Sequence, residues 1–205
     1  MKQVGVLTTL VALVLWNTES NAQSLELMPG TERIFVDVQW LKTFDQARRW
    51  SLFSRSRATV DYEENTNLFT GAYLNYTTPS GFGGTVVGRI STAGAGGDLG
   101  GHFFKANESF LVYALASVAI NTEFAYSWFS IVRYTPKLND AWRVYISLEL
   151  FSNFNADGHV ASVQRLRTGL DHQGYQFGLA LNLAGLGEDY SPTDTNPGVF
   201  VRKQF

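Results

Sequence analysis

Apolar and polar side chains alternate along most of this chain with a period of two residues. Trp142 and Val144 lie on one side of such a stretch, whereas Arg143 lies on the other. Strands have this period because successive side chains point to opposite faces of a sheet. Beyond the N-terminal region, no helical apolar stretch reaches the roughly 18 residues expected of a membrane helix. The pattern predicts an all-β protein and restricts any membrane span to strands.

Turn-forming residues divide the alternation into segments. The predicted strands are 32–42, 49–62, 67–78, 82–92, 109–120, 123–135, 141–154, 160–171, 174–185 and 197–205. Each matches or exceeds the roughly 9–11 residues of a tilted membrane strand, whereas soluble strands average roughly five or six. We predict about ten strands, with eight and twelve as alternatives. Residues 93–109 would then form a long connection, although 98–105 also fits an additional strand.

The last seven residues form a short alternating stretch that ends on an aromatic residue. Val199, Val201 and Phe205 share one face, and Lys203 is the polar exception on it. This ending resembles the closing strand of Gram-negative outer-membrane β-barrels, whose terminal aromatic residue is read during assembly. The resemblance implies that Val199, Val201 and Phe205 form a signal for the barrel-assembly machinery.

The first 22 residues have the order of a secretory signal peptide. Lys2 precedes an apolar run over 4–16, and small residues follow up to Ala22. The run is shorter than the roughly 20 residues that a membrane helix needs. We therefore predict a signal peptide over 1–22, cleavage after Ala22, and one exported barrel domain over 23–205.

Composition excludes several classes of function. The chain has no Cys, so lipoprotein anchors, disulfides and thiolate metal sites are excluded. A net charge of −2, with scattered arginines, shows no bias toward nucleic acid. Three scattered histidines do not have metal-ligand spacing, and His102 and His172 are expected in solvated connections. We predict no cofactor, no metal and no nucleic-acid partner; the oligomeric state stays open.

Aromatic residues favour a lipid-facing exterior over a soluble one. A secreted lipocalin-like barrel or sandwich also alternates, with its apolar face inward. Here Trp50, Tyr62, Trp142 and Tyr175 lie near the ends of apolar faces, as in interfacial aromatic girdles. The fold prediction is a transmembrane, antiparallel, up-and-down β-barrel in the outer membrane, in contact with its lipid. The secreted binder is the alternative.

The whole mature chain resembles small outer-membrane β-barrels in pattern. The segment 145–154, followed by 164–169, is also similar to uncharacterised barrel families with a Glu-x-Phe strand before an Arg-containing, Gly-ended strand. That likeness implies fold and location but no activity. With Phe205 in the periplasm, 172–174 and 136–140 are predicted periplasmic turns. The polar stretch 186–196 is a predicted external loop.

The inward face is predicted to carry nine arginines and five acids. The candidate lumen-lining residues are Arg55, Arg57, Asp61, Arg89, Glu123, Arg133, Arg143, Glu149, Arg165, Arg167 and Asp171, together with Arg33, Asp37 and Arg202. Buried ions need water or each other, because desolvation costs on the order of several kcal/mol per ion. Two non-enzymatic interpretations follow. The barrel is either a salt-bridged structural or partner-binding plug, or a narrow porin-like passage that favours anions.

An enzyme is the alternative function. Ser152-Asn153 resembles the His-x-Ser-Asn motif of barrel lipid A deacylases, but Leu150 stands where that motif has its base. A serine nucleophile requires a base within hydrogen-bond reach, and His159 is the histidine near it in sequence. An ordinary strand-end serine explains Ser152 equally well. We assign no catalytic residue and retain a lipid-modifying barrel enzyme, an acyl hydrolase or transferase, as the alternative.

Overall fold

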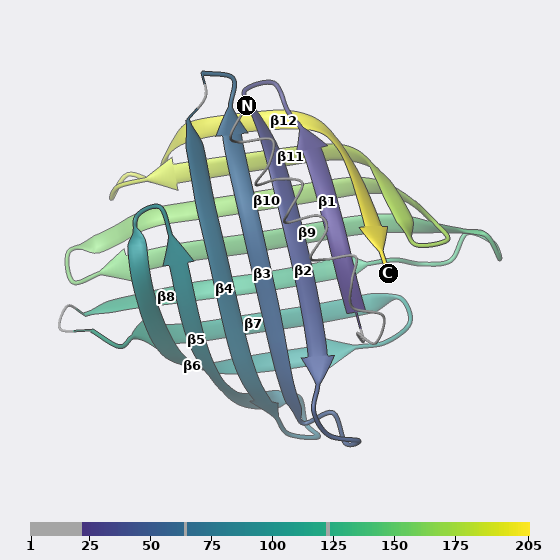
Figure 1. Cartoon of the computed structure of the whole chain (residues 1–205), viewed down its shortest axis with the longest axis horizontal. Coiled ribbons are helices and arrows are strands. Elements are labelled where there is room, and N and C mark those ends of the chain that lie inside the picture. Colours follow the sequence, from purple (N-terminus) through teal and green to yellow (C-terminus); the bar gives the residue numbers. More distant parts are fainter. Residues whose placement is uncertain (1–21, 64, 122–123) are drawn as a thin grey trace, which may run out of the picture.

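The computed structural model describes residues 22–63, 65–121 and 124–205, which form a closed antiparallel barrel of twelve strands (Figure 1). The strands are β1 (Ala22–Pro29), β2 (Arg33–Thr43), β3 (Trp50–Asp61), β4 (Thr66–Thr77), β5 (Phe82–Ser91), β6 (Gly94–Ala106), β7 (Phe110–Ala119), β8 (Ala125–Tyr134), β9 (Trp142–Asn155), β10 (Gly158–His172), β11 (Tyr175–Leu186) and β12 (Ser191–Gln204). Each strand pairs with its neighbours in sequence, and β1 pairs with β12. Closure leaves no fully unpaired edge strand, although the first residues of β12 extend beyond the end of β1. The predicted all-β up-and-down barrel is confirmed; the predicted signal peptide lies outside the described residues except for Ala22.

The preferred count of ten strands is wrong, and twelve is the alternative that holds. The two additional strands are β1 and β6. In β6 the inward positions Gly94, Gly96 and Gly100 carry no side chain, so no alternation is visible there. The stretch 93–109 is therefore a strand between two short turns, and not a long connection.

The predicted extent of the external loop, 186–196, is also wrong. The connection after β11 spans only 187–190, and β12 begins at Ser191. Before Pro197, β12 has β11 as its only neighbouring strand, because β1 ends at Pro29. On that side Pro197 accepts from the Thr31 backbone N–H at 2.9 Å and needs no N–H of its own. Proline is tolerated where a strand needs no N–H donor, which is why Pro197 fits here.

The exterior of the barrel is apolar and exposed. Ile90 and Leu179 are 66% and 65% exposed. Asp37 and Arg55, on the inward face, are 2% and 4% exposed. This arrangement is the reverse of a soluble fold, and only a bilayer makes it favourable. No helix in the described part of the chain is long and apolar enough to span a membrane.

Two walls enclose the lumen. In Figure 1, β1–β4 run steeply across the front, whereas the strands behind them run nearly at right angles to these. Aromatic side chains help to fill the space between the walls. Tyr145 of β9, Gly169, Gly178 and Phe200 of β12 form one row in register, and the two rings meet across the glycines with centroids 5.6 Å apart.

We call the end where β1 begins and β12 ends the terminal end of the barrel. The turns over 78–81, 107–109, 135–141 and 173–174 lie at this end, together with 44–49. All connections between the described strands are short, so no long loop folds into the lumen from either end.

Candidate functional site

A group of five charged side chains crosses the lumen from β2 and β3 to β9 and β10. We call Asp37, Arg55, Arg57, Glu149 and Arg165 the charged cluster. Arg55 donates from Nε and Nη2 to the Asp37 carboxylate at 2.6 and 2.8 Å, and from Nη1 to Glu149. Arg57 bridges the same two acids, at 3.2 Å to Asp37 and 2.5 Å to Glu149. Arg165 reaches Glu149 from the neighbouring strand at 2.6 Å. Glu149 is thus shared by three guanidinium groups.

The charged cluster leaves little free space around it in the lumen. The free space beside Arg55 and Glu149 is a void of about 20 Å³. This is on the order of the space that one water occupies. The cluster stays ionised because arginine does not lose its proton in proteins. It therefore carries three positive and two negative charges.

A second group of arginines lies against β1 and β12. Arg167 Nε donates to Glu26 at 2.9 Å and Nη1 donates to Asn182 at 2.9 Å. Arg202 has neutral acceptors only: the Tyr145 hydroxyl at 3.0 Å, with Ser24 at 2.8 Å and Gln39 at 3.1 Å.

Arg133 has no acidic partner among the described residues. Its guanidinium lies over the Tyr145 ring, 5.7 Å from the centroid. Its Nε is buried without a hydrogen-bond acceptor, as is the Nε of Arg202. Two guanidinium groups therefore converge on Tyr145 without a carboxylate between them.

The remaining candidate residues lie closer to the barrel ends. Arg89 pairs with Asp98 of β6. Arg143 Nε donates to the Thr135 carbonyl at 3.0 Å. Asp171 accepts from Gln176 at 2.8 Å.

Asp61 holds the turn after β3. Its Oδ1 accepts from the Asn65 backbone N–H at 2.8 Å. Arg33 pairs with Asp194, and Glu123 lies outside the described residues. Residues at the ends of strands thus serve turns and local pairs, and the charged cluster holds the walls together.

Sequence reasoning missed several members of the lumen. Glu26 was missed because β1 was not predicted, although Ser24, Glu26 and Met28 alternate with Leu25 and Leu27. His102 is buried within β6, between the Thr77 and Thr85 hydroxyls at 2.9 and 2.7 Å. The expectation of a solvated His102 in a connection is therefore wrong. It failed because the glycines of β6 hide the alternation that would have predicted this strand.

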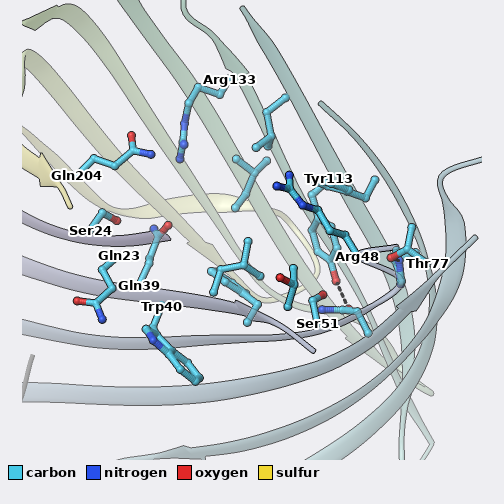
Figure 2. Close-up of a pocket in the computed structure, with 18 of the residues that line it drawn as sticks. Gln23, Ser24, Gln39, Trp40, Arg48, Ser51, Thr77, Tyr113, Arg133 and Gln204 are labelled. Carbon is cyan, nitrogen blue, oxygen red and sulfur yellow. Dashed lines mark hydrogen bonds between the residues drawn. The ribbon is translucent and has the colours of Figure 1, made fainter. Parts of the chain in front are cut away.

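A cavity of about 380 Å³ occupies the lumen between the charged cluster and the terminal end (Figure 2). We call it the vestibule. Thr43, Thr77 and Gln204, at strand ends, line its mouth. Arg133 and Arg202 line its inner part, and Arg48 reaches into it from the 44–49 turn.

Ser152 belongs to a chain of hydrogen bonds on the outer face of the barrel. His159 Nδ1 donates to the Gly187 carbonyl at 2.5 Å, because a carbonyl only accepts. In its neutral form, His159 then accepts at Nε2 from the Ser162 hydroxyl, 2.7 Å away. Ser162 Oγ lies 2.8 Å from Ser152 Oγ. Ser162, rather than Ser152, is therefore the serine with a base.

The described residues contain no group of three or more His, Cys, Asp or Glu side chains that could hold a metal ion. The acids of the charged cluster are occupied by guanidinium groups, which compete with any cation.

Several solved structures share this fold. The KdgM porin in complex with disordered oligogalacturonate superposes with a TM-score of 0.51 at 10% identity, over 90% of this chain and 99% of that one. The NanC porin gives 0.51 at 8% identity, over 90% and 98%. LpxR from Salmonella typhimurium gives 0.50 at 8% identity, over 90% and 99%. No protein-family profile matches the sequence, and no curated protein sequence does.

At these identities the likeness concerns the fold alone. That fold is the one of outer-membrane β-barrel proteins. The exposed apolar exterior agrees with it, because such a surface needs lipid around it. The chain is an integral outer-membrane β-barrel.

Proposed function

We propose that this barrel is a narrow, porin-like passage that favours anions. The observation that carries the proposal is the excess of arginine at mid-lumen. Six arginines face three acids there: Arg55, Arg57, Arg133, Arg165, Arg167 and Arg202 against Glu26, Asp37 and Glu149. Rings of basic side chains select anions in pores because they lower the electrostatic energy of an anion at the constriction.

The solute class follows from the same charges. The KdgM porin, which shares the fold, is described with oligogalacturonate, a chain of sugar acids that carries one carboxylate per unit. A passage with three more arginines than acids fits small carboxylates of this kind better than cations or neutral sugars. On this proposal the structure is the closed form of the passage, a view supported by the void of only about 20 Å³ beside the charged cluster. Solute movement then requires Arg57 and Arg165, at its edge, to rotate away from Glu149.

The test is the reversal potential of the wild-type protein in planar bilayers under a salt gradient. The protein is first shown to be folded by its heat-dependent gel mobility. We expect small, discrete steps whose reversal potential indicates anion preference, and Arg57→Gln and Arg165→Gln should weaken that preference. Cation preference, or a folded protein that stays silent together with both variants, would overturn the proposal.

A second candidate function is supported by the Ser162–His159 pair. Phe151 packs inward, so the neighbouring Ser152 and its partner Ser162 lie on the outer face. An acyl hydrolase at this position would act on lipid esters. Ser162 Oγ would attack the ester carbonyl while its proton passes to His159, which then protonates the leaving alcohol. Water would release the acyl group as a free acid.

This second candidate is tested with a serine-reactive fluorophosphonate probe and with lipid extracts. Tyr190 stacks on His159, with ring centroids 3.7 Å apart, and covers the pair, so the Tyr190→Ala background is included. Labelling that is lost in Ser162→Ala and kept in Ser152→Ala would support hydrolysis. Absence of labelling, together with identical acyl profiles in the wild-type and Tyr190→Ala backgrounds, would contradict the hydrolase function.

We also propose that residues 1–22 are a cleaved signal peptide and that Val199, Val201 and Phe205 direct assembly. The exposed side chains of all three, and a backbone bond of 2.9 Å from Phe205 N to the Gln23 carbonyl, support this role. Deleting Phe205 should lower the yield of heat-modifiable barrel several-fold, and the mature protein should begin at Gln23. An unchanged yield would contradict the assembly role.

A further inference from the structure

The vestibule differs from the rest of the lumen in its charge. Among the described residues, three arginines line it, Arg48, Arg133 and Arg202, and no Asp or Glu does. A cavity with three fixed positive charges and no acid has a strongly positive potential, because low-dielectric walls focus the field. We propose that the vestibule is a binding site for an organic carboxylate that enters from the periplasm.

Unsatisfied donors at the inner wall indicate where the carboxylate lies. The Nε atoms of Arg133 and Arg202 are buried and have no acceptor. Arg202 already uses its other donors on Tyr145, Ser24 and Gln39, all of which are neutral. A buried donor without an acceptor is costly, and a carboxylate is the acceptor that suits a guanidinium best. The carboxylate therefore binds at the inner wall of the vestibule, against the guanidinium groups of Arg133 and Arg202.

Beside polar side chains such as Gln39 and Asn75, the vestibule wall has an apolar part that favours an apolar body on this ligand. Phe53, Phe104, Leu111 and Ile131 line the cavity, and Tyr113 adds an aromatic ring. A sugar acid or an inorganic anion would leave these side chains without a partner. The volume of about 380 Å³ lies within the range of roughly 300–1,000 Å³ that is usual for small-molecule sites. An aromatic or short aliphatic carboxylate fits both the charge and the wall.

Access is from one side only. The charged cluster closes the inner end of the vestibule, and strand ends such as Thr43 and Thr77 surround its mouth. Arg48 belongs to the 44–49 turn beside this mouth, so it can meet a carboxylate before Arg133 does (Figure 2). The terminal end faces the periplasm if Phe205 lies there, as expected from the sequence. Binding does not depend on the proposed passage, because a barrel that conducts nothing still has this vestibule.

Calorimetry of the full barrel in lipid nanodiscs tests the site, with 2-naphthoate as the probe and empty nanodiscs as the blank. Neutral 2-naphthamide controls for the ring, and inorganic phosphate controls for charge alone. We expect 2-naphthoate to bind with a stoichiometry of one and at least about tenfold more tightly than either control, since each lost charge-assisted bond is worth about a factor of ten or more.

Arg133→Gln is the decisive variant, because Arg133 makes no hydrogen bond that the folded barrel needs. It should weaken 2-naphthoate binding about tenfold, whereas Arg143→Gln, which removes an inward arginine outside the vestibule, should not change it. Equal binding of the acid and the amide would overturn the proposal. So would unchanged binding by a folded Arg133→Gln protein. Neither outcome depends on whether the barrel conducts. The binding site and the passage can therefore be contradicted independently of each other.

Discussion

The charged cluster and the vestibule use the same residue in opposite ways. In the cluster, Arg55 donates to two carboxylates and holds β3 against β9 across the lumen. In the vestibule, Arg133 and Arg202 form no ion pair with a carboxylate in the described part of the chain, and the Nε of each is buried without an acceptor. Paired arginines join the walls and close the barrel. Arginines without an acidic partner keep at least the Nε donor for a ligand. Whether a carboxylate lies nearby, rather than the residue type, therefore distinguishes a structural arginine from a binding one here.

The largest effect is expected from Arg55→Met in the charged cluster. Asp37 and Glu149 would lose the guanidinium they share and would remain buried. Removing one partner of a buried ion pair typically costs about 3–5 kcal/mol. Urea unfolding in lipid vesicles, followed by tryptophan fluorescence, measures this loss. A change below about 1 kcal/mol would show that the cluster behaves like a solvated surface pair.

A smaller loss is expected where the two regions meet, at Tyr145. Its side chain is fully buried, and its hydroxyl accepts from Arg202 at 3.0 Å. Tyr145→Phe should destabilise the barrel by about 1–2 kcal/mol, because a charged donor loses a buried acceptor. Tyr126→Phe, at an exposed position on the outer face, is the control and should have no measurable effect.

Arg133→Gln should leave stability almost unchanged or raise it slightly. The substitution removes a buried positive charge that has no acidic partner among the described residues, so desolvation is relieved and no ion pair is lost. The same unfolding assay compares it with Arg55→Met. A loss as large as that of Arg55→Met would mean that Arg133 has a structural role, and the contrast between the two regions would fail.

The smallest effect concerns the turn that carries Arg48. The Trp50 backbone N–H, at 2.8 Å, and the Arg49 N–H, at 3.1 Å, donate to Asp45 and lower its pKa below the ordinary 3.8. The turn therefore has its full stability above pH 3.8 and loses it as the pH falls through the lower folded pKa. The Trp50 amide chemical shift should titrate with a midpoint below 3.8. Loss of the transition in Asp45→Asn is the control, and a midpoint at or above 3.8 contradicts the account.

Sequence reasoning was strong for the outer wall and weak for glycine-rich and proline-containing strands. Periodicity shows a strand only where side chains alternate, so β6 was hidden by its glycines. Pro197 and its polar neighbours indicated a loop, but this part of β12 extends beyond β1, and Pro197 pairs there through its carbonyl alone. The inward face could be predicted because a strand alternates strictly.

Pairing across the lumen could not be predicted from the sequence. Asp37 and Glu149 lie on strands far apart along the chain, and only the curvature of the closed barrel brings Arg55 between them. The Ser162–His159 pair was missed for a similar reason. The bulge between His159 and Ala161 places the imidazole ring of His159 beside Ser162. No local sequence pattern predicts such a bulge.

Single-channel conductance of Glu149→Gln tests the central claim that the charged cluster closes an anion-favouring passage. The variant removes the acid shared by Arg55, Arg57 and Arg165, so these side chains should repel one another and open the constriction. We expect larger steps and a stronger anion preference than in the wild type, with Asp171→Asn, at a strand end, unchanged. If folded Glu149→Gln protein conducts no more than the wild type, the cluster is not the closure of a passage, and the proposal is contradicted.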